Sequence, residues 1–215
     1  MRRTLSILVL LAAVAFAVSP MLSNGFGGYR PDQFPIPQAD PPVQPAGWAF
    51  SIWGLIFAWL VAGSAFGAWK RPADPDWRPM RPALLVSMGL GIFWIETAHN
   101  TAIGATVLIV AMLVPALIAF LRAGQRDAVW QVRPVALYAG WLTAATGASF
   151  GLVLGGFGVM SEQAAAILCL LAVTGTALGV LAARRVNRWP DTLISTLGLV
   201  FYATPSFWFG LMGIV

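Results

Sequence analysis

The sequence predicts an all-α membrane protein: a polytopic helical bundle with about seven transmembrane helices and a cytoplasmic N-terminus. Hydrophobic residues make up 59% of the 215 residues and charged residues only 10%, against about 25% charged in soluble domains. The apolar residues form stretches long enough to span a bilayer, and runs of that length favour helices over strands. The basic residues fall in alternate connections between these stretches. A water-soluble class is therefore excluded.

A helix needs roughly 20 residues to cross about 30 Å of hydrocarbon, and seven stretches come close to that length. They are Thr4–Leu22, Trp48–Trp69, Pro82–Ala98, Thr101–Leu121, Pro134–Leu154, Gln163–Ala183 and Thr192–Leu211. The third is short and meets the fourth across a tight polar turn. The first also has the features of a signal peptide, but Pro20 directly after a cleavage site would be unfavourable, so we expect an uncleaved helix.

Twelve of the thirteen basic residues lie on one side of this arrangement. They are Arg2, Arg3, Lys70, Arg71, Arg78, Arg81, Arg122, Arg126, Arg133, Arg184, Arg185 and Arg188. The other side carries Arg30 with Asp32, Asp40, Glu96 and Glu162. By the positive-inside rule the N-terminus is cytoplasmic and the C-terminus is outside. The formal charge of +5 thus indicates orientation, and no nucleic-acid partner is expected.

Single residues of three reactive types limit the chemistry. One cysteine, Cys169, excludes an intrachain disulfide, and one histidine, His99, makes a His/Cys metal cage implausible. The only lysine, Lys70, lies in a loop, which excludes a retinal Schiff base in the last helix. We expect neither a metal site nor catalytic residues.

Glycines recur at every fourth residue in several of the predicted helices. The sets are Gly63 and Gly67; Gly147, Gly151 and Gly155; and Gly175 and Gly179. Such faces let helix backbones approach closely in lipid. They could pack the monomer or form a homodimer.

A proline-rich outer loop, residues 23–47, connects the first two predicted helices. Six prolines and four glycines exclude regular helix or strand there. The loop could be a semi-rigid cap over the outer mouth of the bundle or a plain connector.

The segment after this loop carries Trp48, Phe50, Trp53, Phe57 and Gly63. It resembles the second helix of the TspO/translocator protein family, the tryptophan-rich sensory proteins, which has Trp-x-Phe-x-x-Trp-x-x-x-(Tyr/Phe) after a proline-rich loop. Weaker matches are Leu90 to Trp94 in the third predicted helix and Tyr138, Trp141 and Ala145 in the fifth. Two family asparagines are replaced by Gly91 and Ser149, and a family aromatic by Ala144.

The resemblance implies a TspO-like five-helix core over residues 1–155, with residues 156–215 adding two transmembrane helices on the same bundle. It also implies a sensory or binding protein for a tetrapyrrole such as a porphyrin, or a similar planar apolar ligand, which regulates tetrapyrrole or pigment metabolism. The implied ligand wall consists of Trp48, Phe50, Trp53, Phe57, Trp94, Tyr138 and Trp141. A bound tetrapyrrole is the implied cofactor.

Tryptophans also gather at membrane interfaces without binding anything. Trp69, Trp77, Trp130 and Trp189 lie at cytoplasmic span ends, where we interpret them as anchors, and Trp48 could be another. Trp53, Trp94 and Trp141 lie within spans, where they could line a ligand site or pack the core.

Polar candidates near the site are Glu96, His99 and Ser149. Glu96 and His99 would share a helix face at i, i+3 and could contact a ligand. Alternatively they belong to the outer turn between two helices, already in water, which is the interpretation we favour.

Two other functions fit the composition. The chain could be an accessory or assembly subunit of a larger, pigment-containing membrane complex, since its small-residue faces and added helices would suit such a role. A small-molecule transporter ranks last, because no internal repeat is visible. In each case we expect a multi-pass protein of a bacterial inner membrane, with the lipid bilayer as its environment.

Overall fold

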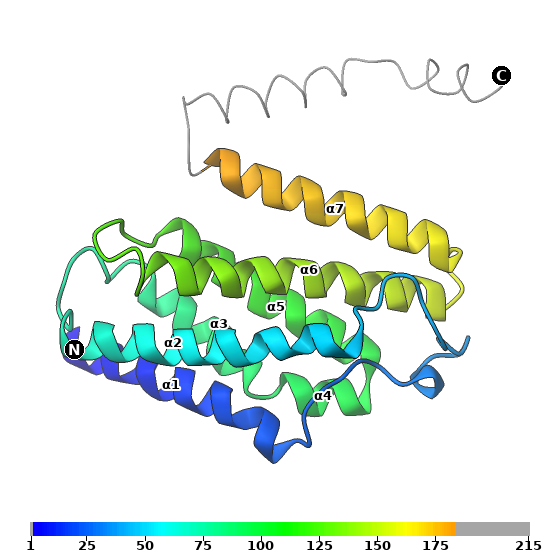
Figure 1. The fold of residues 1–215 in the computed structure, drawn as a ribbon, viewed down its shortest axis with the longest axis horizontal. Helices are drawn as coiled ribbons and strands as arrows, with labels where there is room; N and C mark the ends of the chain where they lie inside the picture. The colour runs from blue at the N-terminus through cyan, green and yellow to red at the C-terminus, as the bar shows by residue number, and fades with distance from the viewer. Residues whose placement is uncertain (1, 184–215) are drawn as a thin grey trace. The chain divides into compact units, whose positions relative to one another are not determined.

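The computed structural model describes residues 2–183, and every regular element in that part of the chain is helical. The longer helices are α1 (Arg2–Leu22), α2 (Ile52–Trp69), α3 (Arg81–Gly91), α4 (Trp94–Asn100), α5 (Ala102–Leu121), α6 (Val132–Gly156) and α7 (Glu162–Ala183) (Figure 1). Short 3-10 turns are η1 (Pro31–Gln33) and η2 (Gly47–Ser51). The all-α prediction is confirmed for these residues, whereas the predicted seventh span lies outside them.

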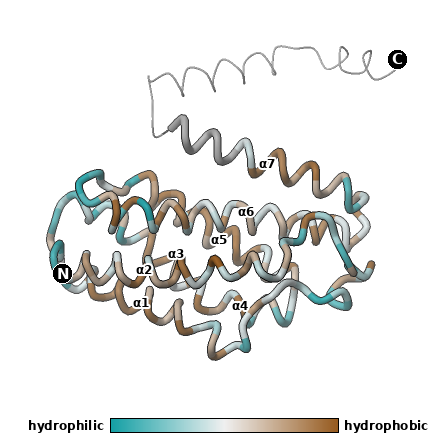
Figure 2. The backbone as a smooth tube through the Cα atoms, in the orientation of Figure 1, coloured by the Kyte–Doolittle hydropathy of each residue, from teal (hydrophilic) through white to brown (hydrophobic). Residues whose placement is uncertain are grey.

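Four segments of the described chain are long and apolar enough to cross a membrane. They are Arg3–Leu22, Gly47–Trp69, Ala102–Leu121 and Val132–Gly156. Hydrophobic residues follow these helices, and hydrophilic ones gather in the loops at their ends (Figure 2). Large apolar side chains such as Leu11 and Val107 remain exposed, as lipid contact requires.

The predicted third span, Pro82–Ala98, is not a single helix in the structure: it is divided into α3 and α4 at Ile92 and Phe93. Gly91, a weak helix former, is the last residue of α3 and lies against the Phe16 ring of α1, where a Cβ would collide. Thr101 then caps α5 by accepting a hydrogen bond from the Gly104 amide at 3.3 Å.

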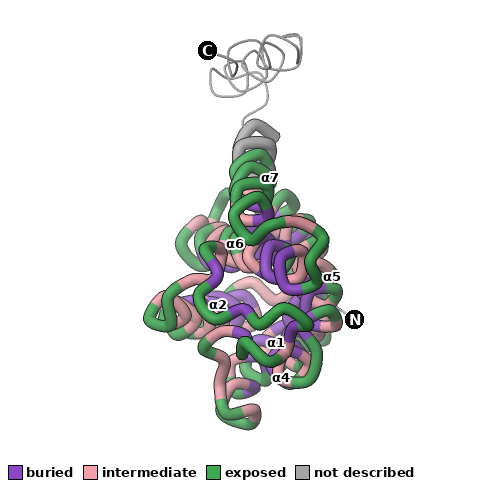
Figure 3. Tube along the Cα trace, turned by 90° about the vertical axis from the view of Figure 1, so that its right-hand side faces the viewer, coloured by how far each residue is buried: buried purple, intermediate pink, exposed green. Residues whose placement is uncertain are grey.

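Five helices form a closed ring. In order around it, α1 packs against α2, α2 against α6, α6 against α5, α5 against α3, and α3 against α1. The end-on view shows buried segments of these helices turned toward the middle (Figure 3). Ile56, Met88, Met112 and Tyr138 fill this interior. The short α4 packs on α5.

The chain forms two compact units, residues 1–173 and 174–215, and the site lies in the first. Several of the predicted glycine positions make close contacts there. Gly67 faces the Trp77 ring and Gly63 the Trp130 carbonyl, while Gly147 faces Val173 of α7. These glycines therefore serve packing inside the chain. The proposed boundary at residue 155 stays a prediction.

Candidate functional site

Residues 23–46, which we call the cap, lie against the ends of α4 and α6. Gln33 donates from Nε2 to the carbonyls of Ala98 (2.8 Å) and His99 (3.2 Å) at the end of α4. The Ile36 amide donates to the Gly156 carbonyl at 2.9 Å. These bonds favour the cap interpretation of the proline-rich loop over a plain connector. The turn that starts it uses positive φ at Asn24 and Gly25.

Aromatic rings converge beneath the cap. Phe26, which comes from the cap, meets Trp94 edge-to-face at 4.8 Å between centroids and Phe50 at 5.5 Å. Trp53 stacks on Phe57 at 5.1 Å and meets Trp141 at 6.2 Å. Aromatic pairs at such separations each add about 0.5–1.5 kcal/mol beyond burial. The cluster joins the cap, η2, α2, α4 and α6 into one wall.

Two cavities open beside this cluster. The larger has a volume of about 320 Å³ and lies between α1, α2, α4 and the start of the cap, with Trp53, Phe57 and Pro20 among its walls. The smaller has about 50 Å³ and lies between the cap and α6, bounded by Tyr29, Trp141 and the small side chains of α6. Phe26, Phe50 and Trp94 line both, so these three rings form a shared partition.

The structure brings five of the seven implied wall residues to these cavities: Phe50, Trp53, Phe57, Trp94 and Trp141. Tyr138 lies behind them, fully buried, with its hydroxyl 2.8 Å from Ser87 Oγ. Trp48 is 80% exposed and lines neither cavity.

Two indole N–H groups at the site differ in their partners. Trp94 donates from Nε1 to the Ala105 carbonyl at 3.1 Å. Trp141 Nε1 is buried and has no hydrogen-bond partner among the described residues. A buried donor without a partner costs about 1–3 kcal/mol. Trp141 therefore offers an unused donor in the wall of the smaller cavity.

Of the three polar candidates, Ser149 lines a cavity, whereas Glu96 and His99 do not. Ser149 lines the smaller cavity, and its Oγ lies 3.3 Å from the Tyr29 hydroxyl of the cap. Glu96 is exposed on α4 and accepts a hydrogen bond from Asn100 Nδ2 at 3.1 Å. The His99 ring lies 6.3 Å from Phe26 and lines neither cavity.

Phe16 and Phe26 are site residues that the sequence analysis missed. Phe26 stands between glycines in Gly25-Phe-Gly-Gly-Tyr29, and aromatic residues within such a flexible stretch could have indicated a contact. The three departures from the family pattern also gain structural explanations. Gly91 makes room for Phe16, Ser149 pairs with Tyr29, and Ala144 lines the smaller cavity.

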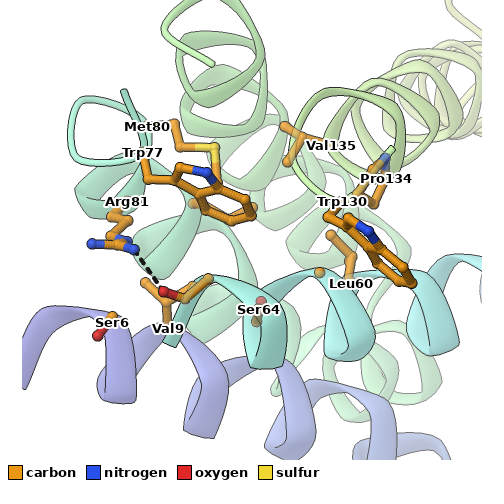
Figure 4. Close-up of a pocket in the computed structure, with 13 residues that line it drawn as sticks. Ser6, Val9, Leu60, Ser64, Trp77, Met80, Arg81, Trp130, Pro134 and Val135 are labelled. Atoms are coloured by element: carbon orange, nitrogen blue, oxygen red, sulfur yellow. Dashed lines mark hydrogen bonds between the residues drawn. The ribbon is translucent and has the colours of Figure 1, made fainter. Parts of the chain in front are cut away.

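We call one end of the bundle the basic end; it consists of the N-terminus and loops 70–80 and 122–131. Trp77, which the sequence analysis interpreted as a membrane anchor, lies there. Trp77 is only 1% exposed and donates from Nε1 to Asp127 at 2.8 Å, so its interpretation as a membrane anchor is wrong. Trp69 is exposed, as an anchor would be, and Trp189 lies outside the described residues. The open volume among Trp77, Leu60 and Val135 is about 10 Å³, which is too small for a ligand. Figure 4 shows these side chains.

The chain matches the family model described as TSPO-like protein over residues 5–195, a range that includes α7. Comparison with curated proteins gave no match. Comparison with solved structures gave none either. With a match over most of its length and four apolar helices of spanning length, the chain is an integral membrane protein that belongs to the TSPO-like family.

Proposed function

We propose that this protein binds a planar apolar ligand of the tetrapyrrole type in the aromatic cavity beneath the cap, as a sensory or binding protein of a bacterial inner membrane. The observation that carries the proposal is the convergence of Phe26, Phe50, Trp53, Phe57 and Trp94 on one cavity. Small-molecule pockets are concave and mostly apolar, with a few placed polar groups. The larger cavity supplies the apolar walls, and the adjoining smaller cavity supplies polar groups at Tyr29 and Ser149.

The two cavities together would hold a larger ligand than the larger cavity alone. The 320 Å³ of the larger cavity lies at the lower end of the usual range of about 300–1,000 Å³. Rotation of the partition rings Phe26, Phe50 and Trp94 would join it to the smaller cavity. A flat macrocycle could then extend from Phe57 toward Trp141.

The polar groups indicate the ligand's second feature. Trp141 Nε1 has no hydrogen-bond partner in the part of the chain that the structure describes, and the Tyr29 and Ser149 hydroxyls lie in the same cavity wall. Together they would bind a hydrogen-bond acceptor such as a carboxylate or carbonyl. Tetrapyrroles combine a flat apolar ring with carboxylate side chains, which matches both parts of the site.

The first prediction tests this site by porphyrin titration of the purified full chain in detergent. We expect a saturable change in the porphyrin absorption band. Trp53→Ala, which removes a ring of the larger cavity, should weaken binding at least tenfold, because truncating an aromatic anchor typically costs 2 kcal/mol or more. Trp141→Phe keeps a ring but loses the N–H, and should weaken binding by about threefold to tenfold.

Trp48→Phe is the matched control, since it alters an exposed tryptophan outside both cavities and should bind as the unmodified chain does. Absence of saturable binding would refute the proposal. Equal losses in the Trp48 and Trp53 variants would refute the location of the site.

A further inference from the structure

A separate pocket of about 390 Å³ lies at the basic end. The start of α1 forms one wall through Thr4, Leu5 and Leu8. The loop before α3 and the first residue of α3 form the other through Ala73, Arg78 and Arg81. None of these residues lines either aromatic cavity. The pocket therefore requires its own explanation.

Arg81 is a buried cation in this pocket. Its side chain is 3% exposed, and its guanidinium donates to the carbonyls of Arg71 (2.6 Å), Pro72 (2.8 Å) and Gly67 (3.0 Å). Figure 4 shows Arg81 with its hydrogen bond to the backbone of α2. No ion pair of Arg81 occurs in the described part of the chain. Carbonyl dipoles thus hold the charge in place without neutralising it.

Arg78 adds an accessible cation to the same wall. It is exposed and forms no ion pair with a residue that the structure describes. The carboxylates of this loop are engaged elsewhere. Asp74 pairs with Arg71 (3.7 Å) and Arg126 (3.3 Å), and Asp76 accepts from the Arg126 amide (3.4 Å). The charged lining of the pocket is therefore entirely positive.

The pocket changes from polar to apolar along α1. From Thr4 to Leu8 the helix rises about 6 Å, and the exposed Leu8 belongs to an apolar helix long enough to cross the membrane. The pocket thus sets the two arginines opposite Leu5 and Leu8, a pairing of cations with apolar side chains that suits a lipid headgroup and the start of its acyl chain. The positive-inside rule places this end in the cytoplasmic leaflet.

We propose that this pocket binds an anionic phospholipid, with its phosphate on Arg78 beside the fixed charge of Arg81 and an acyl chain along Leu5 and Leu8. Arginine binds phosphate oxygens through its fork of N–H donors. Basic pockets between helices on the cytoplasmic side favour such headgroups. The site would anchor the start of α1 to the loop before α3.

Native mass spectrometry of the purified full chain tests the proposal, with phosphatidylglycerol, phosphatidylcholine or soluble glycerol phosphate added. We expect one phosphatidylglycerol bound in preference to phosphatidylcholine. Arg78→Gln should weaken it roughly fivefold, the effect of one basic residue near a membrane surface. Ala73→Glu adds a carboxylate to the pocket lining while both arginines stay in the sequence, and it should weaken lipid binding at least as much. Arg122→Gln, an exposed arginine of the other basic loop, is the control and should leave binding unchanged.

Equal binding of the two lipids would overturn the proposal. So would an equal loss in the Arg122 and Arg78 variants, because general surface charge would then account for binding. Full competition by glycerol phosphate at lipid-equivalent concentrations would identify a soluble anion as the ligand and refute the lipid. If Arg78→Gln does not fold, unchanged lipid binding by Ala73→Glu refutes the pocket.

Discussion

Asp127 joins the two loops of the basic end through one carboxylate. It accepts from Arg71 Nε at 2.8 Å and Nη2 at 3.3 Å, and from the Trp77 indole at 2.8 Å. The hydrogen bonds from Arg71, with a smaller contribution from Trp77, hold the pKa of Asp127 below its usual range, although partial burial opposes the shift. Charge-assisted bonds of this kind are stronger than neutral ones.

The second prediction concerns this carboxylate. Because its pKa is lower in the folded than in the unfolded state, Asp127 stabilises the fold fully above about pH 4, the unfolded value, and progressively less as the pH falls through the folded value. Thermal unfolding in detergent should therefore show a lower Tm on acidification below about pH 4. Asp127→Asn should lower Tm at pH 7 and flatten this dependence. An unchanged acid slope in the variant would contradict the assignment.

At the scale of elements, the ring of five helices depends on backbone approach at α2. A Cβ at Gly63 would collide with the Trp130 carbonyl, and one at Gly67 with the Trp77 ring. The hydrophobic effect does not drive helices together inside a bilayer, so their packing depends on close van der Waals contact. The glycines of α2 thus position the helix that carries Trp53 and Phe57.

The third prediction compares two glycines. Gly63→Ala should destabilise the protein by about 1–3 kcal/mol, since the obstacle is backbone and cannot rotate away. Gly140→Ala on α6 meets nothing within 4 Å, so it should be neutral or stabilise by about 0.5–1 kcal/mol through helix propensity. Unfolding in mixed micelles measures both. Equal stability of the two variants would show that α2 does not pack as described.

At the scale of the whole molecule, the distribution of charge predicts the orientation in the membrane. The fourth prediction uses the single cysteine: in a Cys169→Ser background, Asp40→Cys on the cap should react with an impermeant maleimide added to intact cells. Arg122→Cys at the basic end should react only after permeabilisation. Reversed labelling would contradict the positive-inside assignment.

Much of the helical bundle could be predicted, because spans of apolar residues and clustered arginines are local signals. The break at Ile92 could not, and neither could the contact of the adjacent Gly91 with Phe16, because Phe16 comes from a helix distant in sequence. Motif spacing located Trp53, Trp94 and Trp141 at the cavities. It could not exclude Trp48 or identify Trp77 as a buried donor, because both depend on how the chain folds back on itself. The accessory-subunit and transporter functions stay predictions.

The position of Phe26 has a consequence for how ligand occupancy could be sensed. Its ring separates the two cavities, yet its backbone belongs to the cap and to no membrane-spanning helix. A molecule that joins the two cavities must displace this ring, and the segment that carries the ring also carries Tyr29 with its bond to Ser149. If a ligand binds as proposed, displacement of Phe26 would thereby alter the cap, a segment that lies outside the four candidate membrane spans.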